Sequence, residues 1–232
     1  MSIVIPAYNE ERYLGRCLQA LCAQRYPASH FELIVVNNGG TDATADIARC
    51  FGVRIVSEPR KGVARARQTG FEAARSGIIA STDAHATVPA FWLARIAAHF
   101  ETDPDLGAVY GSVYWPDGRP LERLALRYPA TWVLWASNRL GRSLWWGSNF
   151  AVRREVFYAA GGFPVDWPSG EDTDLSLRVN RIAPVRFDPD LIVHASSRRM
   201  REGWGRMMSR STVGMVNRLV RRQPLLPMPD IR

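Results

Sequence analysis

An aspartate and a histidine stand two residues apart in Asp83-Ala84-His85, directly after a short apolar run. Side chains two apart on an extended segment project to the same side, so a carboxylate oxygen and an imidazole nitrogen could share one cation. A loop that caps the next helix is the alternative, because the pattern is common by chance. The position at the end of a predicted strand, in line with two other polar loops, favours the cation site.

Those two polar loops also follow predicted strands. The first reads Pro6-Ala7-Tyr8-Asn9-Glu10, and the second runs from Asn37 to Asp42. Each could be an ordinary strand-to-helix turn with a capping Asn or Thr. Side by side at one edge of a sheet, they could instead hold a nucleotide base and ribose. Neither loop has GxGxxG spacing, so the fingerprint of a nicotinamide dinucleotide site is absent.

Three carboxylates, Glu171, Asp172 and Asp174, open a predicted helix after a loop rich in proline and glycine. The helix dipole favours negative charge in a first turn without any catalysis. The functional alternative is that one of the three is a general base at the junction of loop and helix. His194 follows another apolar run and could equally be a hydrogen-bonded histidine of the core.

The elements that must position these residues alternate through the first half of the chain. Short apolar runs bounded by Gly, Pro, Asn or Asp predict buried parallel strands. They lie at Ser2–Ile5, Leu33–Val36, Val53–Val56, Ile78–Ser81 and Ala108–Val113. Apolar residues at helical spacing predict helices at Glu11–Cys22, Asp42–Phe51, Val63–Ser76 and Pro89–Glu101. Such alternation predicts an α/β fold with right-handed crossovers, whose ligands bind beyond the carboxyl ends of the strands.

The alternation is lost after Tyr114. A turn at Trp115-Pro116-Asp117-Gly118 precedes an aromatic, helix-like stretch that extends to about Trp146. The remaining predicted elements are a strand at Asn149–Val152, a helix from Arg153, a loop at Gly161–Gly170, a helix from Glu171 and short strands at Val185–Phe187 and Ile192–His194. We therefore expect one integrated domain with two subdomains, 1–114 and 115–197, followed by a tail at 198–232.

Eight pieces of the sequence between residues 2 and 194 match one family in the family's own order. They are Ser2–Glu10, Val36–Ala45, Gly62–Gly70, Asp83–His85, Gly147–Arg154, Gly161–Phe163, Glu171–Leu175 and His194. One such piece is weak evidence, and eight in order are strong. Together they resemble the family 2 glycosyltransferases. The resemblance implies the GT-A fold: a Rossmann-like, mostly parallel sheet flanked by helices, with a smaller mixed subdomain that binds the acceptor.

The resemblance also implies a donor site for a nucleotide diphosphate-sugar. The residues it places at the donor are Pro6, Ala7, Tyr8, Glu10, Asn37, Arg67 and Asp83. Of these, Pro6, Tyr8, Glu10 and Asn37 would line the base and ribose pocket. The family usually has Asp where Asn37 stands, accepting a bond from the uracil ring N–H. A UDP-sugar remains the favoured donor, and the amide makes uridine less secure because it also offers a hydrogen-bond donor.

The same resemblance implies the ligands of a metal ion and the residue that acts as general base. Asp83 resembles the first carboxylate of the family's DxD motif, which holds Mg²⁺ or Mn²⁺ against the diphosphate, and His194 resembles a late histidine that completes the site in some relatives. His85 replaces the second Asp, as in the DxH site of polypeptide N-acetylgalactosaminyltransferases. Imidazole suits Mn²⁺ better than Mg²⁺, so we expect Mn²⁺ first and Mg²⁺ second. Asp172 resembles the base that deprotonates the acceptor hydroxyl, with Glu171 beside it.

The expected function is an inverting, metal-assisted transfer of a sugar to a hydroxyl. Such a transfer needs a stabilised leaving group, a deprotonated acceptor and in-line geometry. Candidate acceptors are a sugar, a lipid-linked molecule or another hydroxyl, as in polysaccharide or glycolipid synthesis. One alternative is a nucleotidyltransferase of similar fold, which generally has a Gly-rich, basic loop where Pro6–Glu10 stands. A catalytically silent nucleotide-sugar-binding protein is the other.

Four tryptophans lie within 15 residues, just before the matched piece that begins at Gly147. They are Trp132, Trp135, Trp145 and Trp146. Indole rings stack on sugars and also fill cores, and core packing is the favoured interpretation here. Trp146 and Trp167 are the better candidates for contact with substrate, because both border matched motifs.

Charge is concentrated in the tail of this 232-residue chain. Nine arginines against Glu202 and Asp230 give residues 198–232 a surplus of +7, so the body carries only about +1 of the total +8. Because a nucleic-acid binder would normally have a basic folded core, we expect no nucleic-acid partner. Met200, Trp204 and Met207 would lie on one helical face opposite arginines such as Arg210, which predicts either attachment to an anionic membrane surface or packing on the body.

Composition excludes several other classes. At 47% hydrophobic and 22% charged residues, the chain is neither disordered nor fibrous. Its apolar runs are shorter than the ~18 residues that span a bilayer, and Met1–Pro6 does not read as a secretory signal. Cys17, Cys22 and Cys50 form no CxxC pair, so a disulfide framework is not expected. We expect a cytoplasmic protein, peripheral at a membrane if the tail binds there.

Overall fold

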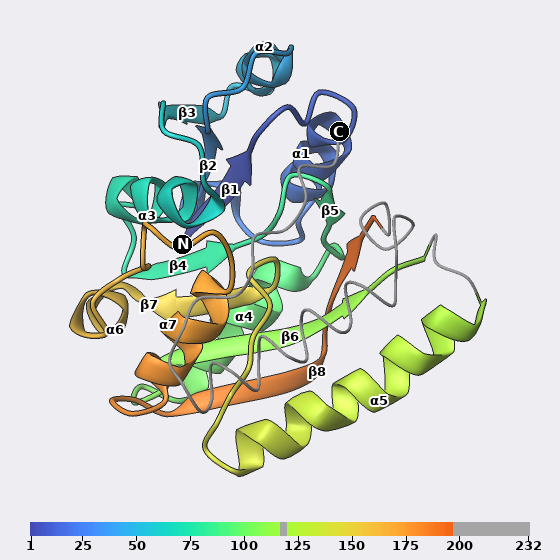
Figure 1. Cartoon of the computed structure of the whole chain (residues 1–232), viewed down its shortest axis with the longest axis vertical. Coiled ribbons are helices and arrows are strands. Elements are labelled where there is room, and N and C mark those ends of the chain that lie inside the picture. The colour runs from blue at the N-terminus through green and yellow to red at the C-terminus, as the bar shows by residue number, and fades with distance from the viewer. Residues whose placement is uncertain (117–119, 197–232) are drawn as a thin grey trace.

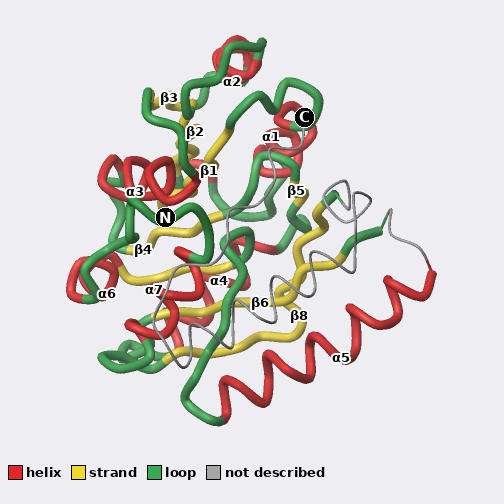
Figure 2. Tube along the Cα trace, in the orientation of Figure 1, coloured by secondary structure: helices red, strands yellow, loops and turns green. Residues whose placement is uncertain are grey.

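A computed structural model describes residues 1–116 and 120–196. Within them the strands form one sheet in the order β3-β2-β1-β4-β7-β6-β8-β5, seen edge to edge in Figures 1 and 2. The bounds are β1 Ser2–Ala7, β2 Glu32–Asn37, β3 Arg54–Ser57, β4 Ile78–Ser81, β5 Ala86–Thr87, β6 Ala108–Tyr114, β7 Phe150–Arg153 and β8 Val185–Ala195. The first half of the sheet is parallel, as predicted, whereas β7 runs antiparallel to β4 and β6.

Helices cover both faces of this sheet. Their bounds are α1 Leu14–Cys22, α2 Thr44–Cys50, α3 Val63–Ala73, α4 Trp92–Thr102, α5 Pro120–Arg139, α6 Arg154–Ala159 and α7 Glu171–Val179, with a 3₁₀ turn at Ala28–His30. Alternate residues of β1 face opposite layers: Ile3 and Ile5 pack with α1 and α4, and Val4 packs with α3. Because both faces are covered, the strands are apolar on both sides, as buried parallel strands are.

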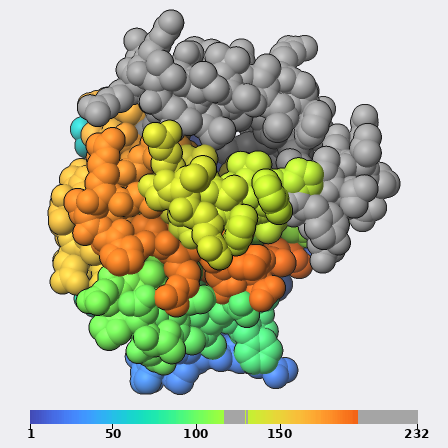
Figure 3. All heavy atoms as spheres, turned by 90° about the horizontal axis from the view of Figure 1, so that it is seen from below, coloured from blue at the N-terminus to red at the C-terminus, as the bar shows by residue number. Residues whose placement is uncertain are grey.

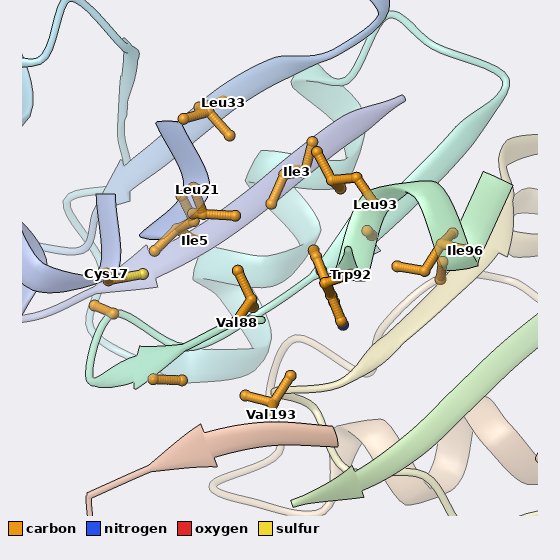
Figure 4. Close-up of a cluster of buried hydrophobic side chains, with 14 of the residues drawn as sticks. Ile3, Ile5, Cys17, Leu21, Leu33, Val88, Trp92, Leu93, Ile96 and Val193 are labelled. Carbon is orange, nitrogen blue, oxygen red and sulfur yellow. The ribbon is translucent and has the colours of Figure 1, made fainter. Parts of the chain in front are cut away.

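The core between β1, α1 and α4 is shown in Figure 4. Ile3, Ile5 and Leu21 meet Trp92 and Ile96, and all five side chains are buried. Trp92 is fully enclosed and donates its Nε1–H to Asn149 Oδ1 at 2.9 Å, so its polar atom is satisfied. This core supports the strands whose carboxyl ends carry the polar loops.

The last strand differs from the prediction. Val185–Phe187 and Ile192–His194 are not separate strands but the two ends of β8, which runs parallel to β6 with a register shift at Gly111 and Ser112. A Cβ on Gly111 would lie 1.8 Å from the Leu191 carbonyl oxygen, so only glycine permits this close approach. The irregularity therefore bends one strand without ending it.

Other elements were missed or misjudged in length. The two-residue strand β5 pairs with β8 and was not predicted. The aromatic helix ends at Arg139, not near Trp146, because Gly141 adopts φ +65° and terminates the helix. Strands of both predicted subdomains share one sheet, since β6 lies between β7 and β8. The predicted tail at 198–232 and part of the turn near Gly118 lie outside the described residues.

Candidate active site

Two loops meet at the carboxyl ends of β1 and β2, where Ala7 and Asn37 are in register. Asn9 Oδ1 accepts the Thr41 N–H at 2.8 Å, and the Glu10 N–H donates to Thr44 Oγ1 at 2.8 Å. These bonds join the loops that the sequence places side by side. Pro6 and Tyr8 are half-buried here and Ala7 is buried, so the first loop offers Pro6 and Tyr8 as its surface.

A third loop, between β3 and α3, completes this edge. The buried Asn38 side chain donates to the carbonyls of Glu58 and Arg60 and accepts the Gly62 N–H. The loop held in this way carries Lys61, whose Nζ donates to Tyr8 Oη at 2.6 Å. Sequence reasoning missed Lys61, although it is the single lysine among 30 basic residues.

Asp83 and His85 follow β4 in a turn that is closed by the Ala86 N–H, which donates to the Asp83 carbonyl oxygen at 3.0 Å. Ala84 between them is buried and Asp83 and His85 are partly exposed, but the chain turns here and is not the extended segment that the spacing argument assumes. His85 Nδ1 lies 3.8 Å from Glu10 Oε1, so the Asp83–His85 segment adjoins the first loop. Three of the predicted site residues therefore lie at one edge of the sheet.

Arg67 of α3 connects this edge with α7. Its side chain is 5% exposed, donates to Asp83 Oδ1 at 2.8 Å, and forms a second ion pair with Glu171. A Cβ on Gly147 would lie 2.4 Å from Arg67 Cζ, so glycine is required where the guanidinium lies. The Gly147 N–H in turn donates to Asp172 Oδ2 at 2.7 Å.

Electrostatics keeps the Arg67 guanidinium charged. Burial lowers the pKa of Arg67, but the carboxylates of Glu171, Asp83 and Asp172 raise it by more, so the guanidinium stays protonated. Burial raises the pKa of Glu171, and the Arg67 guanidinium opposes that effect. Glu171 is thus held in place by an ion pair, and Arg67 joins the Asp83 side of the site to the Asp172 side.

Asp172 is positioned by backbone groups. Its Oδ1 accepts the Thr173 N–H at 2.6 Å and its Oδ2 accepts the Gly147 N–H. Gly170 precedes the helix with φ +79°, which turns the chain into the first turn of α7. Asp172 is half-buried, whereas Glu171 is buried. Of these two adjacent carboxylates, Asp172 is the more open to an incoming molecule.

The predicted metal residues fit a cation only in part. Within residues 1–116 and 120–196, no three His, Cys, Asp or Glu side chains are grouped to hold a metal ion. A divalent cation that binds together with substrate phosphates needs only one or two protein ligands. Asp83 and His85 supply a carboxylate and an imidazole of that kind, which suits Mn²⁺.

His194 lies on β8, which runs beside the chain that follows His85: the Ser196 N–H donates to the His85 carbonyl oxygen at 3.3 Å. It is exposed on β8, in register with Thr87 of β5, and its ring centroid is 5.7 Å from that of Tyr114. Burial and the positive charge of Arg16 lower the pKa of His194. His194 is therefore an exposed imidazole beside the ring of Tyr114, with a positive charge at Arg16 nearby.

A groove of about 590 Å³ lies between α5 and the strands β6 and β8. Its lining includes Tyr114, Trp132, Trp135, Asp190 and His194. Figure 3 shows the yellow-green atoms of α5 directly beside orange atoms of the last described elements. An aromatic groove with polar groups at its wall is suited to a sugar or another amphipathic molecule.

The tryptophans differ from the prediction that core packing dominates. Trp145 is buried, stacked on Phe150 with ring centroids 4.9 Å apart. Trp132 is 69% exposed, and Trp135 and Trp146 are also exposed. Trp132 and Trp135 of α5 line the groove, and the sequence pattern did not show this because the packing of α5 against β6 and β8 is a tertiary feature.

No helix within the described residues has the length and apolar character needed to cross a membrane.

Comparison with known proteins gives a consistent family. The family model described as glycosyl transferase family 2 matches residues 2–161. Glycosyltransferase AglE of Haloferax volcanii is 30% identical over 186 residues, which cover 77% of this chain and 60% of that protein. This chain thus spans less than two thirds of that relative's length.

Solved structures show the same fold. Mannosyltransferase PcManGT from Pyrobaculum calidifontis, in complex with GDP-Man and Mn²⁺, superposes with a TM-score of 0.76 at 23% identity, covering 97% of this chain and 65% of that one. S. aureus TarS 1–349, in complex with UDP-GlcNAc, gives a TM-score of 0.70 at 18% identity, covering 84% and 58%. The predicted α/β architecture of the GT-A type is confirmed.

Proposed function

Because the chain belongs to glycosyl transferase family 2, we propose that it moves a sugar from a nucleoside diphosphate-sugar to an acceptor hydroxyl, with inversion at the anomeric carbon. The observation that carries the proposal is the cluster around Arg67, which joins Asp83 at the end of β4 to Glu171 beside Asp172. A leaving group on the Asp83 side and a base on the Asp172 side would face the sugar from opposite directions. If the acceptor oxygen attacks the anomeric carbon from the side opposite the departing diphosphate, the configuration at that carbon is inverted.

The donor would bind over the three joined loops. Tyr8 and Asn37 would contact the base and Glu10 the ribose, with Pro6 and Ala7 shaping the pocket. Arg67 would lie near the diphosphate, where a buried guanidinium stabilises developing negative charge. That the base of the donor is uracil, which the sequence favours, stays a prediction.

Asp83 and His85 would hold a divalent cation, Mn²⁺ before Mg²⁺. When bound, such an ion neutralises charge on the departing diphosphate. Asp83 accepts a bond from Arg67 through Oδ1, so its carboxylate would be shared between the guanidinium and the cation. His194 remains a candidate ligand from the resemblance, and the pairing of β8 with β5 places it in register with Thr87, two residues after His85.

Asp172 would act as the general base. Backbone N–H groups of Gly147 and Thr173 orient its carboxylate, and the helix dipole at the start of α7 favours its charge. It would accept the proton of the acceptor hydroxyl as the oxygen attacks the sugar. Glu171 would act through Arg67 as a positioning residue, because burial and the ion pair keep it from the acceptor.

The acceptor would approach along the groove under α5. The exposed rings of Trp132 and Trp135 offer stacking surfaces. Next to Tyr114 in the chain, Trp115 extends this aromatic surface to Trp146, whose ring centroid lies 5.8 Å from that of Trp115. Gly147, the next residue, contacts Asp172. An acceptor sugar or a lipid-linked acceptor matches this aromatic surface, and the basic tail at 198–232 would attach the protein to an anionic membrane that carries it.

Nucleotide binding tests this proposal and its metal dependence. We expect a nucleoside diphosphate to bind in calorimetry with Mn²⁺, more weakly with Mg²⁺, and to lose affinity with EDTA. Asp83→Ala should abolish the metal-dependent part, whereas Asp166→Ala, which removes an exposed carboxylate paired with Arg65, should bind normally. Affinity that is unchanged by EDTA would contradict the metal assignment. Hydrolysis of the bound donor separates an active transferase from a silent binder.

A further inference from the structure

The last two turns of α5 have a buried side and an exposed side. Leu134 is buried, and its carbonyl oxygen accepts the Tyr110 hydroxyl at 3.1 Å. α5 packs on β6 and β8 with this side, and its other side lies at the outside of the molecule (Figure 1). A surface helix of a globular protein normally has polar side chains on its outer side. The outer side of α5 departs from that rule.

Four large apolar side chains lie exposed there. Leu140, at 77%, and Trp132, at 69%, are the most exposed large apolar side chains of the described residues, and Val133 and Trp135 are exposed as well. Val133 and Leu140 are seven residues apart and share one flank of the helix. Trp132 and Trp135 lie on the flank that borders the groove, with ring centroids 5.9 Å apart. We call these four residues the outer patch of α5.

Arginines accompany the outer patch. Arg139 Cζ lies 5.0 Å from the centroid of the Trp135 ring, and the side chains of Arg139 and Arg142 are exposed. Residues 120–142 contain four arginines and a single acid, Glu122. The exposed apolar side chains therefore belong to a positively charged segment. A contiguous exposed patch marks a surface that contacts a protein, a ligand or a membrane, and its charge helps to decide between them.

This combination matches the boundary between the headgroups and the acyl chains of a bilayer. Tryptophan is enriched there because its ring is apolar and its N–H is polar. Arginine pairs with anionic headgroups while its stem follows apolar surface. A second copy of the chain on the same patch would bring the two sets of arginines face to face, and such like-charge contact costs free energy.

We propose that the outer patch of α5 is a membrane-docking surface, which inserts Val133, Leu140 and the edges of both tryptophans among the headgroups of an anionic bilayer. The helix would lie in the plane of the surface, as interfacial amphipathic segments do. Since Trp132 and Trp135 also line the groove, the groove would open at the bilayer and admit an acceptor that carries a lipid. That consequence rests on the proposed function, whereas the docking surface itself does not.

Sedimentation of the full chain with vesicles, without nucleotide, tests the docking surface. The vesicles contain about 30% phosphatidylserine in phosphatidylcholine, or phosphatidylcholine alone. Val133→Ser with Leu140→Ser is the test variant, because neither side chain lines the groove. Phe91→Ser with Tyr158→Ser is the matched control, because it also removes two exposed apolar side chains, both outside α5. Thermal melting of each variant verifies that it is folded.

We expect wild type and the control variant to bind the anionic vesicles equally, and the test variant to bind about tenfold more weakly, because two apolar side chains no longer enter the bilayer. Binding should weaken at about 0.5 M salt, which screens the charges, and should be weaker with phosphatidylcholine alone. Brominated acyl chains quench indoles that they contact. They should therefore quench the fluorescence of wild type more than that of Trp132→Phe with Trp135→Phe.

A test variant that binds as tightly as the control variant would overturn the proposal, because attachment would then depend on the basic tail at 198–232 alone. Equal binding of wild type to both kinds of vesicle, or binding to neither, would overturn an anionic docking surface. A wild-type dimer that the test variant converts to a monomer would show that the patch joins two copies of the chain instead. Failure of the proposed function would appear in the nucleotide titrations and would leave these vesicle results unchanged.

Discussion

Arg67 is the residue through which the two sides of the candidate site touch. One nitrogen of its guanidinium pairs with Asp83 and another with Glu171, and the side chain is almost fully buried. Breaking a buried pair by removing one partner leaves an uncompensated charge, which is strongly destabilising. Arg67 therefore supports both the stability of the chain and the geometry of its site.

We expect Arg67→Met to lower the free energy of unfolding by about 3–5 kcal/mol, because Glu171 is left buried as an unpaired carboxylate. Adding Glu171→Gln should restore a large part of that loss, since the second change removes the orphaned charge. Urea unfolding of the two single variants and the double variant measures the coupling. Additive losses in the double variant would show that the two side chains do not depend on each other.

Asp172 carries the chemistry in this account. Asp172→Asn keeps the size of the side chain but cannot take up the acceptor proton, so kcat should fall by on the order of 10²–10⁴ while donor Kd changes only a few-fold. Asp174→Asn, in the same helical turn and paired with Arg178, is the control and should retain turnover. If Glu171→Gln abolished turnover and Asp172→Asn kept it, the base would be Glu171.

The carboxylate of Asp188 on β8 binds two side chains of helix α4. Asp188 is buried and accepts hydrogen bonds from Arg95 at 2.5 and 2.8 Å and from His99 Nε2 at 2.7 Å. Burial alone would raise the pKa of Asp188, but the bonds from His99 and Arg95 bring it well below its ordinary value. This contact stands where β8 shifts register against β6, so it holds the bend of the strand that ends at His194.

Asp188→Asn should cost about 3 kcal/mol of unfolding free energy near pH 7. Asp190→Asn, which alters an exposed pair with the same arginine, should cost less than about 1 kcal/mol. An ionised Asp188 with a lowered pKa stabilises the folded state above the unfolded value near ~4, and that contribution fades as pH falls below it. The difference between wild type and Asp188→Asn should therefore shrink at pH 3. Urea unfolding at both pH values measures it, and a difference that grows in acid would contradict the role of the ionised carboxylate.

Local pattern was sufficient for most elements and insufficient for their junctions. The parallel strands β1, β2 and β4 are apolar on both faces, so their positions follow from composition and bounding residues. β8 was split because Asp188-Pro189-Asp190 is typical of a turn. In the structure, pairing with β6 and the bonds from Arg95 and His99, far along the chain, hold this segment within one strand. β5 has two residues, Ala86 and Thr87, which are too few to show an alternation of apolar and polar side chains.

At the scale of the molecule, the sequence indicated which loops carry polar groups but not how they are joined. The role of Lys61 depends on Asn38, which brings the third loop to Tyr8 through bonds to Arg60 and Gly62. The contact of Gly147 with Arg67 likewise joins segments distant in sequence. Such links arise from tertiary packing, so spacing within a segment cannot predict them.

The central claim is that the three joined loops and Asp83 form a nucleoside diphosphate site, and thermal melting with a nucleotide panel tests it most directly. Ligand at about 100 times Kd stabilises a protein by ~2.7 kcal/mol, which for a chain of this size raises Tm by about 5–10 °C. The account predicts such a rise with Mn²⁺ and at least one of UDP, CDP and GDP, a smaller rise with the matching monophosphate, and loss of the rise in Asp83→Ala. No rise in Tm with any diphosphate at millimolar concentration, or an equal rise in wild type and Asp83→Ala, would contradict it.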